Sequence, residues 1–258
     1  MRLKVLACKL LYREISLLTA TSEHIIDTTY LRQGFHDTPS LLRSLLQKEI
    51  DMLDQGEDVY SYLPDCEAHD FDAILLGYGL CSNAVAGLTS QKYKIVVPRA
   101  HDCATLLLGS KDMYKSIFDS GHGGIYWYSA GWNENSIMPS KFRVEQTRAE
   151  YEEKYGEDNA EYLMEMEQNW LKEYKHCMFI DWASMCNEKH IAYTKECADY
   201  LGWEYKQLAG DDTLMRDFLS GNWDDTRFQV IQPGKKLMQS FDENVFRVGE
   251  ANEVVEEK

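Results

Sequence analysis

The sequence has no long apolar run, and its positive charge is scarce. No stretch approaches the roughly 18 consecutive apolar residues of a membrane-spanning helix. The short apolar run at the start is broken by Lys9, Arg13 and Glu14, and no small-residue cleavage site follows it, so we expect a first strand rather than a signal peptide. A net charge of −16 repels phosphates. We therefore expect a cytoplasmic protein that binds neither nucleic acid nor membranes.

Cysteine is too sparse for a disulfide scaffold. The seven cysteines are an odd number spread over 258 residues, whereas secreted disulfide-rich domains are shorter and denser in cysteine. Reduced thiols in a reducing compartment are therefore expected, and free cysteine often packs like a small apolar residue. We expect core positions for four of them: Cys66, Cys177, Cys186 and Cys197. Of these four, only Cys186 is also a candidate for a site, because it follows a strand end.

The chain does contain a regular alternation of strand-like and helix-like segments. Residues 3–8 and 24–31 are strand-like, and residues 71–79 and 93–98 are nearly continuous apolar runs, as in strands buried on both faces. Between the second and third runs, Thr38-Pro39 opens a helical pattern that ends at Gly56. The alternation continues to about residue 234. It predicts an α/β fold with a mostly parallel sheet and helices on both faces, in Rossmann-like layers.

One segment departs from this alternation. Residues 141–175 are highly charged and favour helix, with a break expected at Gly156, which indicates an acidic helical insertion. The predicted organisation is an N-terminal α/β half over residues 1–140, this insertion, a C-terminal α/β part over residues 176–240, and an acidic tail over residues 241–258.

Three cysteines follow three of the predicted strands. Cys8 ends the first strand, Cys81 lies just past the run at 71–79, and Cys103 lies just past the run at 93–98. In open parallel sheets, ligands bind beyond the carboxyl ends of the strands. If these strands are near neighbours, the three thiols converge on one crevice. We favour this interpretation over three separate core thiols.

Thiolate-rich sites select zinc or iron–sulfur clusters. Three cysteines without a close pair are typical of a 4Fe-4S cluster whose fourth iron is left open for substrate. Three ligands and an open position also describe catalytic zinc, with His101 as a candidate fourth ligand. A structural zinc is disfavoured because none of the three has another cysteine within four residues. A metal-free alternative is a reactive Cys103 thiolate, activated by His101 or by the start of the next helix.

Polar residues at the same strand ends are candidates for the chemistry. His101, His36 and Glu14 are the candidates for moving protons, and Asp102 places a carboxylate beside Cys103.

Three further residues are candidates for binding the substrate. Arg99 could pair with an anionic group, and Gly79 lets the main chain approach a ligand closely. Asn83, in the same loop as Cys81, is the third.

Several motifs together resemble the prokaryotic family called domain of unknown function 1638. The resemblance spans about residues 4–236, and its motifs are "AC" near the start, "GFHDTP", "GYGLCSNAVAGL", "PRAHDCATLLLGS", "YWYSAGW" and "LSGNWDDTRFQVIQPGK". It implies a stand-alone α/β protein of anaerobic bacteria and archaea, often found with genes of corrinoid-dependent methyl transfer. The family pattern coincides here with Cys8, His36, Cys81, His101, Asp102 and Cys103.

Three functions remain open from the sequence. The first is a metalloprotein of anaerobic metabolism, an enzyme of lyase, reductase or methyltransferase type, whose 4Fe-4S cluster acts on a small polar molecule. The second is a zinc-thiolate protein in corrinoid-linked methyl transfer, with a corrinoid or methyltransferase protein as partner. The third is a non-catalytic accessory protein whose acidic helices bind a partner. Formation of a homo-oligomer is also open.

Overall fold

The computed structural model describes residues 1–57, 70–81, 83–120 and 123–255, with only the main chain of His36. The contacts within the chain divide it into two compact units. The first unit comprises Met1–Lys111 and Asp212–Lys258, and the second comprises Asp112–Asp211. Each unit is treated separately below.

The first unit is built on a five-stranded sheet with the order β2-β1-β3-β4-β8. The first four strands of this order are parallel, and β8 at the edge runs antiparallel to β4. The apolar runs of the sequence form the centre of the sheet, where β3 and β4 are buried along their whole length. The strands are β1 Arg2–Cys8, β2 Ile25–Leu31, β3 Ala73–Gly77, β4 Ile95–Pro98 and β8 Phe228–Ile231.

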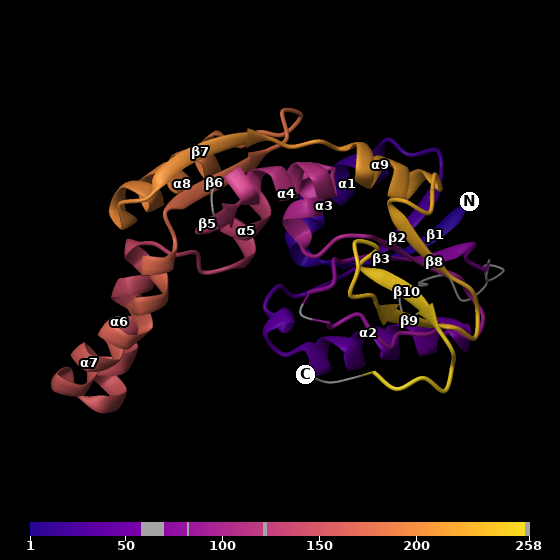
Figure 1. The fold of residues 1–258 in the computed structure, drawn as a ribbon, viewed down its shortest axis with the longest axis horizontal. Coiled ribbons are helices and arrows are strands. Elements are labelled where there is room, and N and C mark those ends of the chain that lie inside the picture. The colour runs from indigo at the N-terminus through magenta and orange to yellow at the C-terminus, as the bar shows by residue number, and fades with distance from the viewer. Residues whose placement is uncertain (58–69, 82, 121–122, 256–258) are drawn as a thin grey trace. The chain divides into compact units, whose positions relative to one another are not determined.

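Helices cover both faces of this sheet. Figure 1 shows α2 on one side and α1, α3 and α9 on the other. The helix α2, Pro39–Asp54, starts with proline at its first position and buries a stripe from Leu42 to Leu53. The remaining helices are α1 Tyr12–Ala20, α3 Cys103–Leu108 and α9 Thr213–Ser220, with short 3-10 turns at Lys9–Leu11 and Phe35–Asp37.

A two-stranded antiparallel sheet completes the first unit. It pairs β9, Lys236–Gln239, with β10, Phe246–Gly249. The strand β10 lies inside residues 241–258, so part of the segment expected as an acidic tail is paired with β9.

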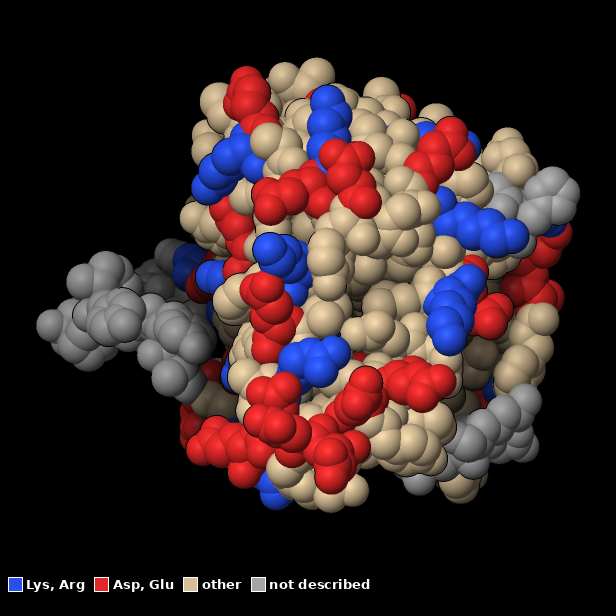
Figure 2. Space-filling view, turned by 90° about the vertical axis from the view of Figure 1, so that its left-hand side faces the viewer, with Lys and Arg blue, Asp and Glu red and all other residues tan. Residues whose placement is uncertain are grey.

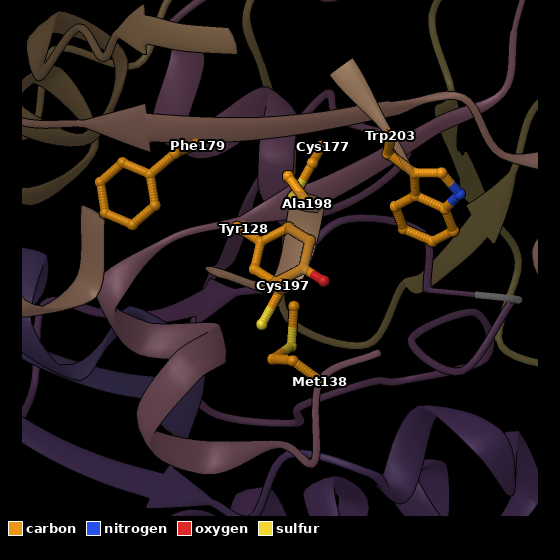
Figure 3. Packing of buried hydrophobic residues seen from close by; sticks show 7 residues of the cluster. All are labelled: Tyr128, Met138, Cys177, Phe179, Cys197, Ala198 and Trp203. Carbon is orange, nitrogen blue, oxygen red and sulfur yellow. The ribbon is translucent and has the colours of Figure 1, made fainter. Parts of the chain in front are cut away.

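The second unit has its own three-stranded parallel sheet, in the order β5-β6-β7. Its core contains Tyr128, Phe179 and Trp203, together with two thiols, Cys177 and Cys197 (Figure 3). The elements are α4 Lys111–Ser120, β5 Ile125–Tyr128, α5 Ala130–Asn135, β6 His176–Asp181, α8 Glu188–Leu201 and β7 Glu204–Ala209.

The charged segment of the second unit forms two helices separated at Gly156, as expected. They are α6 Lys141–Tyr155 and α7 Glu157–Gln168, and a 3-10 turn at Asn169–Glu173 follows. Gly156 has φ +80°, in the range that favours glycine, and an ion pair of 3.1 Å between Arg143 and Glu167 joins the two helices. Figure 2 views the side that carries α6 and α7 and shows Asp and Glu side chains gathered there.

The fold therefore confirms the α/β class, the mostly parallel sheet and the helices on both faces. The predicted strands divide between two parallel sheets, because β4 pairs with the late strand β8 and not with β5. Among the helices that the structure describes, none is long and apolar enough to cross a membrane.

Candidate three-thiol site

Two loops of the first unit are packed directly against each other at the carboxyl ends of β3 and β4. The Leu80 amide donates to the Ala100 carbonyl at 2.8 Å, and the Cys81 amide donates to the His101 carbonyl at 3.2 Å. A Cβ on Gly79 would lie 2.7 Å from the main-chain nitrogen of Asp102, closer than real Cβ atoms approach. Only glycine allows this contact, which brings the loop of Cys81 onto the loop of Cys103.

The strand β1 brings Cys8 to the same edge of the sheet. Ala7 pairs with Gly77 in the parallel register of β1 and β3, and a Cβ on Gly77 would lie 2.6 Å from the Cβ of Ala7. Cys8 follows Ala7 directly, so it ends β1 at the point where β3 leads into the loop of Cys81.

The thiol of Cys103 interacts with the thiols of Cys8 and Cys81. Cys8 and Cys103 are 8% and 9% exposed, and Cys81 is half-buried. A hydrogen bond with Cys103 lowers the pKa of Cys8, although burial opposes this. Hydrogen bonds with Cys8 and then Cys81, reinforced by burial, raise the pKa of Cys103 well above its usual value. These opposite shifts favour a charged thiolate at Cys8 beside a neutral thiol at Cys103.

The main chain of the Cys81 loop is strained. Cys81 has φ +47° and Asn83 has φ +69°, and residues other than glycine rarely adopt such main-chain angles. Arg43 donates from Nη2 to the Asn83 carbonyl at 3.0 Å and so holds the loop against α2. Strain of this kind occurs where the surrounding structure fixes a functional loop.

Tyr78 belongs to this site, although the sequence did not single it out. Its side chain is 2% exposed, and its hydroxyl is buried without a hydrogen-bond partner in the part of the chain that the structure describes. Burial raises the pKa of Tyr78 well above its usual value, and the charges of Cys8, Cys81 and Cys103 add to this effect. The available signal was the "GYG" triplet, a large side chain with a polar tip between two glycines at a strand end.

Asp102 and His101 have different surroundings. Asp102 is the N-cap of α3, and its Oδ1 accepts from the Thr105 amide at 3.1 Å and from the Thr105 hydroxyl at 3.2 Å. This cap fixes the first turn of α3 and with it Cys103. His101 precedes the cap and is exposed, and its carbonyl accepts from the Cys81 amide. Its imidazole is therefore open to solvent.

Arg99 is engaged in holding the fold together. It is 8% exposed, and every nitrogen of its guanidinium donates a hydrogen bond within the first unit. The acceptors are the carbonyls of Asp225, Phe228, Asn244 and Phe246 and the side chain of Gln229, at 2.6–3.2 Å. The guanidinium thus joins β8 to β10, and its role in substrate binding stays a prediction.

The other two predicted proton carriers are Glu14 and His36. Glu14 is buried in the first turn of α1, at 3% exposure. His36 lies in the 3-10 turn Phe35–Asp37, and its side chain is outside the described part of the structure.

The remaining cysteines are separate from this site. Cys177 and Cys197 are core residues of the second unit, as expected, and burial raises their pKa values to about 12 and about 11. Cys186 is exposed and is therefore not a core thiol. Cys66 lies outside the described residues.

The fold and this site define an α/β protein with three thiols at the carboxyl edge of a parallel sheet. A family model, described as protein of unknown function (DUF1638), matches residues 30–219, a narrower range than the motifs suggested. The chain belongs to this family. Cys81 and Cys103 fall inside the matched range and Cys8 precedes it. Neither a curated protein nor a solved structure matches the chain.

Proposed function

We propose that this chain is a metalloprotein in which Cys8, Cys81 and Cys103 hold an iron–sulfur cluster with one open position, and that it acts on a small polar molecule. The observation that supports the proposal is that Cys103, at the start of α3, interacts with Cys8 at the end of β1 and with Cys81 in the loop after β3. No local feature of the sequence requires thiols at all three places, whereas a shared soft ligand gives them a common purpose.

The donor set fits such a group in its chemistry. Thiolates are the ligands that iron–sulfur clusters select, and the buried hydroxyl of Tyr78 is a polar atom beside them that still lacks a partner. Within the described ranges, no group of three or more His, Cys, Asp or Glu side chains could hold a metal ion as placed. The sheet register and the cap of α3 fix the main chain at Cys8 and Cys103, and rotation about the Cα–Cβ bond can still move each sulfur.

Each residue of the site would have a separate role. The three cysteines anchor the group, which supplies a Lewis acid or an electron at its open position. Asp102 orients Cys103 through the cap of α3. His101, which is exposed and whose carbonyl accepts from the Cys81 amide, exchanges protons with the bound molecule.

Zinc is the second candidate, because it too is bound by thiolate ligands and needs only three protein ligands when one position stays open. Zinc held by three thiolates would suit the corrinoid-linked methyl transfer that the family resemblance implies.

Metal and acid-labile sulfide analysis of anaerobically purified protein tests the proposal and separates its two forms. Iron with stoichiometric sulfide supports the cluster, and zinc alone supports the second candidate. Replacing Cys8, Cys81 or Cys103 singly by Ser should remove most of the metal, because a hard hydroxyl replaces a soft thiolate.

The matched control is Cys197→Ser in the core of the second unit, which should retain the metal and cost about 1 kcal/mol of stability. A wild-type protein without metal, or three variants that all keep it, would defeat the proposal. His101→Ala then defines the role of the imidazole: loss of metal makes it a ligand, and retained metal with altered reactivity makes it a proton carrier.

A further inference from the structure

The hydroxyl of Tyr78 is a buried donor without an acceptor. The side chain is 2% exposed, and its Oη has no hydrogen-bond partner among the described residues. Folded proteins rarely leave a buried polar group in this state, because it has lost water and gained nothing in return. A second buried tyrosine of the same unit shows the ordinary situation: the Tyr93 hydroxyl donates to Asp70 at 3.1 Å.

The register of the sheet places Tyr78 beside Cys8. Ala7 of β1 and Gly77 of β3 are partners, so the residues that follow them extend together from the edge of the sheet. Cys8 is the last residue of β1 and Tyr78 directly follows the last residue of β3, so the two residues are neighbours at the carboxyl edge of the sheet. Of the three thiols, Cys8 has the largest electrostatic effect on Tyr78.

The acceptor quality of sulfur depends on its charge. A neutral thiol is a weak acceptor, whereas hydrogen bonds to ionised groups are about twice as strong as neutral ones. A metal deprotonates the thiols that bind it. The group beside Tyr78 therefore becomes a good acceptor at the moment when the site is loaded.

We propose that the Tyr78 hydroxyl donates a hydrogen bond to the Sγ of Cys8 once that sulfur is a metal-bound thiolate. This inference rests on the proposed function. Tyr78 acts through Cys8 and is a positioning residue, which orients the sulfur and withdraws negative charge from it. Outer partners of this kind typically contribute about 10-fold to 100-fold to metal affinity.

The test compares Tyr78→Phe with Tyr93→Phe in protein loaded with Co²⁺, whose bands report on its thiolate ligands. Competition with a chelator should show Co²⁺ bound about 10-fold or more weakly by Tyr78→Phe, with sulfur-to-metal charge-transfer bands shifted from those of the wild type. Tyr93→Phe should match the wild type in both measurements. Equal affinity and an unshifted spectrum for Tyr78→Phe would overturn the inference while leaving the proposed function standing.

Urea unfolding of the metal-free proteins supplies an independent measurement. Tyr78→Phe should be as stable as the wild type or more stable, because it removes a hydroxyl that bonds to nothing. Tyr93→Phe should be less stable, since it loses the bond to Asp70. A clear loss of stability in metal-free Tyr78→Phe would show that the hydroxyl already has a partner and would overturn the inference. A wild-type protein that binds neither Co²⁺ nor iron would defeat the proposed function first, and the inference with it.

Discussion

Replacing Arg99 by Lys should destabilise the first unit severely without changing what its thiols bind. The guanidinium serves four main-chain carbonyls through Nε and Nη1 and the Gln229 side chain through Nη2. An ammonium is a single point with three donors and cannot reach two separated pairs of carbonyls. At least two buried carbonyls then lose their donor, at about 1–3 kcal/mol each.

We therefore expect a loss of about 4 kcal/mol, which corresponds to a fall of about 10 °C in Tm for a unit of this size. Thermal unfolding measures the change, and urea titration checks it through the midpoint. The control is Arg247→Lys, because Arg247 is half exposed and pairs with Glu253 at the surface, where we expect little change. If Arg99→Lys is as stable as the wild type but no longer binds a ligand, the structural role is refuted. Arg99 would then be a substrate-binding residue.

Three further predictions follow from individual contacts. Asp102→Ala removes the cap of α3, so it should lower the free energy of unfolding by about 1 kcal/mol and reduce the amount of bound metal. Asp102→Ser should restore much of the stability and of the metal binding. Urea titration measures the first effect and metal analysis the second. Hydrogen bonds from Thr226 and Arg227 hold the pKa of Asp224 well below its usual range, so this carboxylate stabilises the fold above about pH 4 and the benefit is lost as the pH falls further. The urea midpoint of the wild type should accordingly exceed that of Asp224→Asn at pH 6, and the gap should narrow below about pH 4; a constant gap contradicts this. In the native protein, iodoacetamide should label exposed Cys186 well before the two core thiols of the second unit, Cys177 and Cys197. Peptide mass spectrometry can follow the labelling of each thiol.

The sequence predicted those structural features that depend on the residues of a single segment. The apolar runs that became β3 and β4 are buried along their whole length, and only strands covered on both faces need such runs. The break at Gly156 was readable because a positive φ favours glycine. The general rule that parallel strands end at one edge of their sheet was enough to place the three cysteines at that edge, and their role as metal ligands stays a prediction.

Contacts between distant segments could not be read in this way. The pairing of β4 with β8 joins Val96 to Val230, and nothing in either segment specifies the other. For the same reason Arg99 looked free to bind a substrate, since its acceptors lie more than a hundred residues further along the chain. Tyr78 was missed because an unpaired hydroxyl becomes visible only after all its neighbours are placed.

The main-chain contacts of the site predict that metal removal will not unfold the protein. The three thiols are held in place by the register of β1 and β3, by the amide of Cys81 and by the cap of α3, and none of these contacts involves a ligand. The strands β3 and β4 behind them are buried along their whole length, unlike small zinc domains that are unfolded without metal. Far-ultraviolet circular dichroism of chelator-treated protein should therefore match that of the loaded protein, with a lower Tm set by the lost binding energy. A random-coil spectrum after chelation would show instead that the metal holds the strand ends together and that the contacts described here are its consequence.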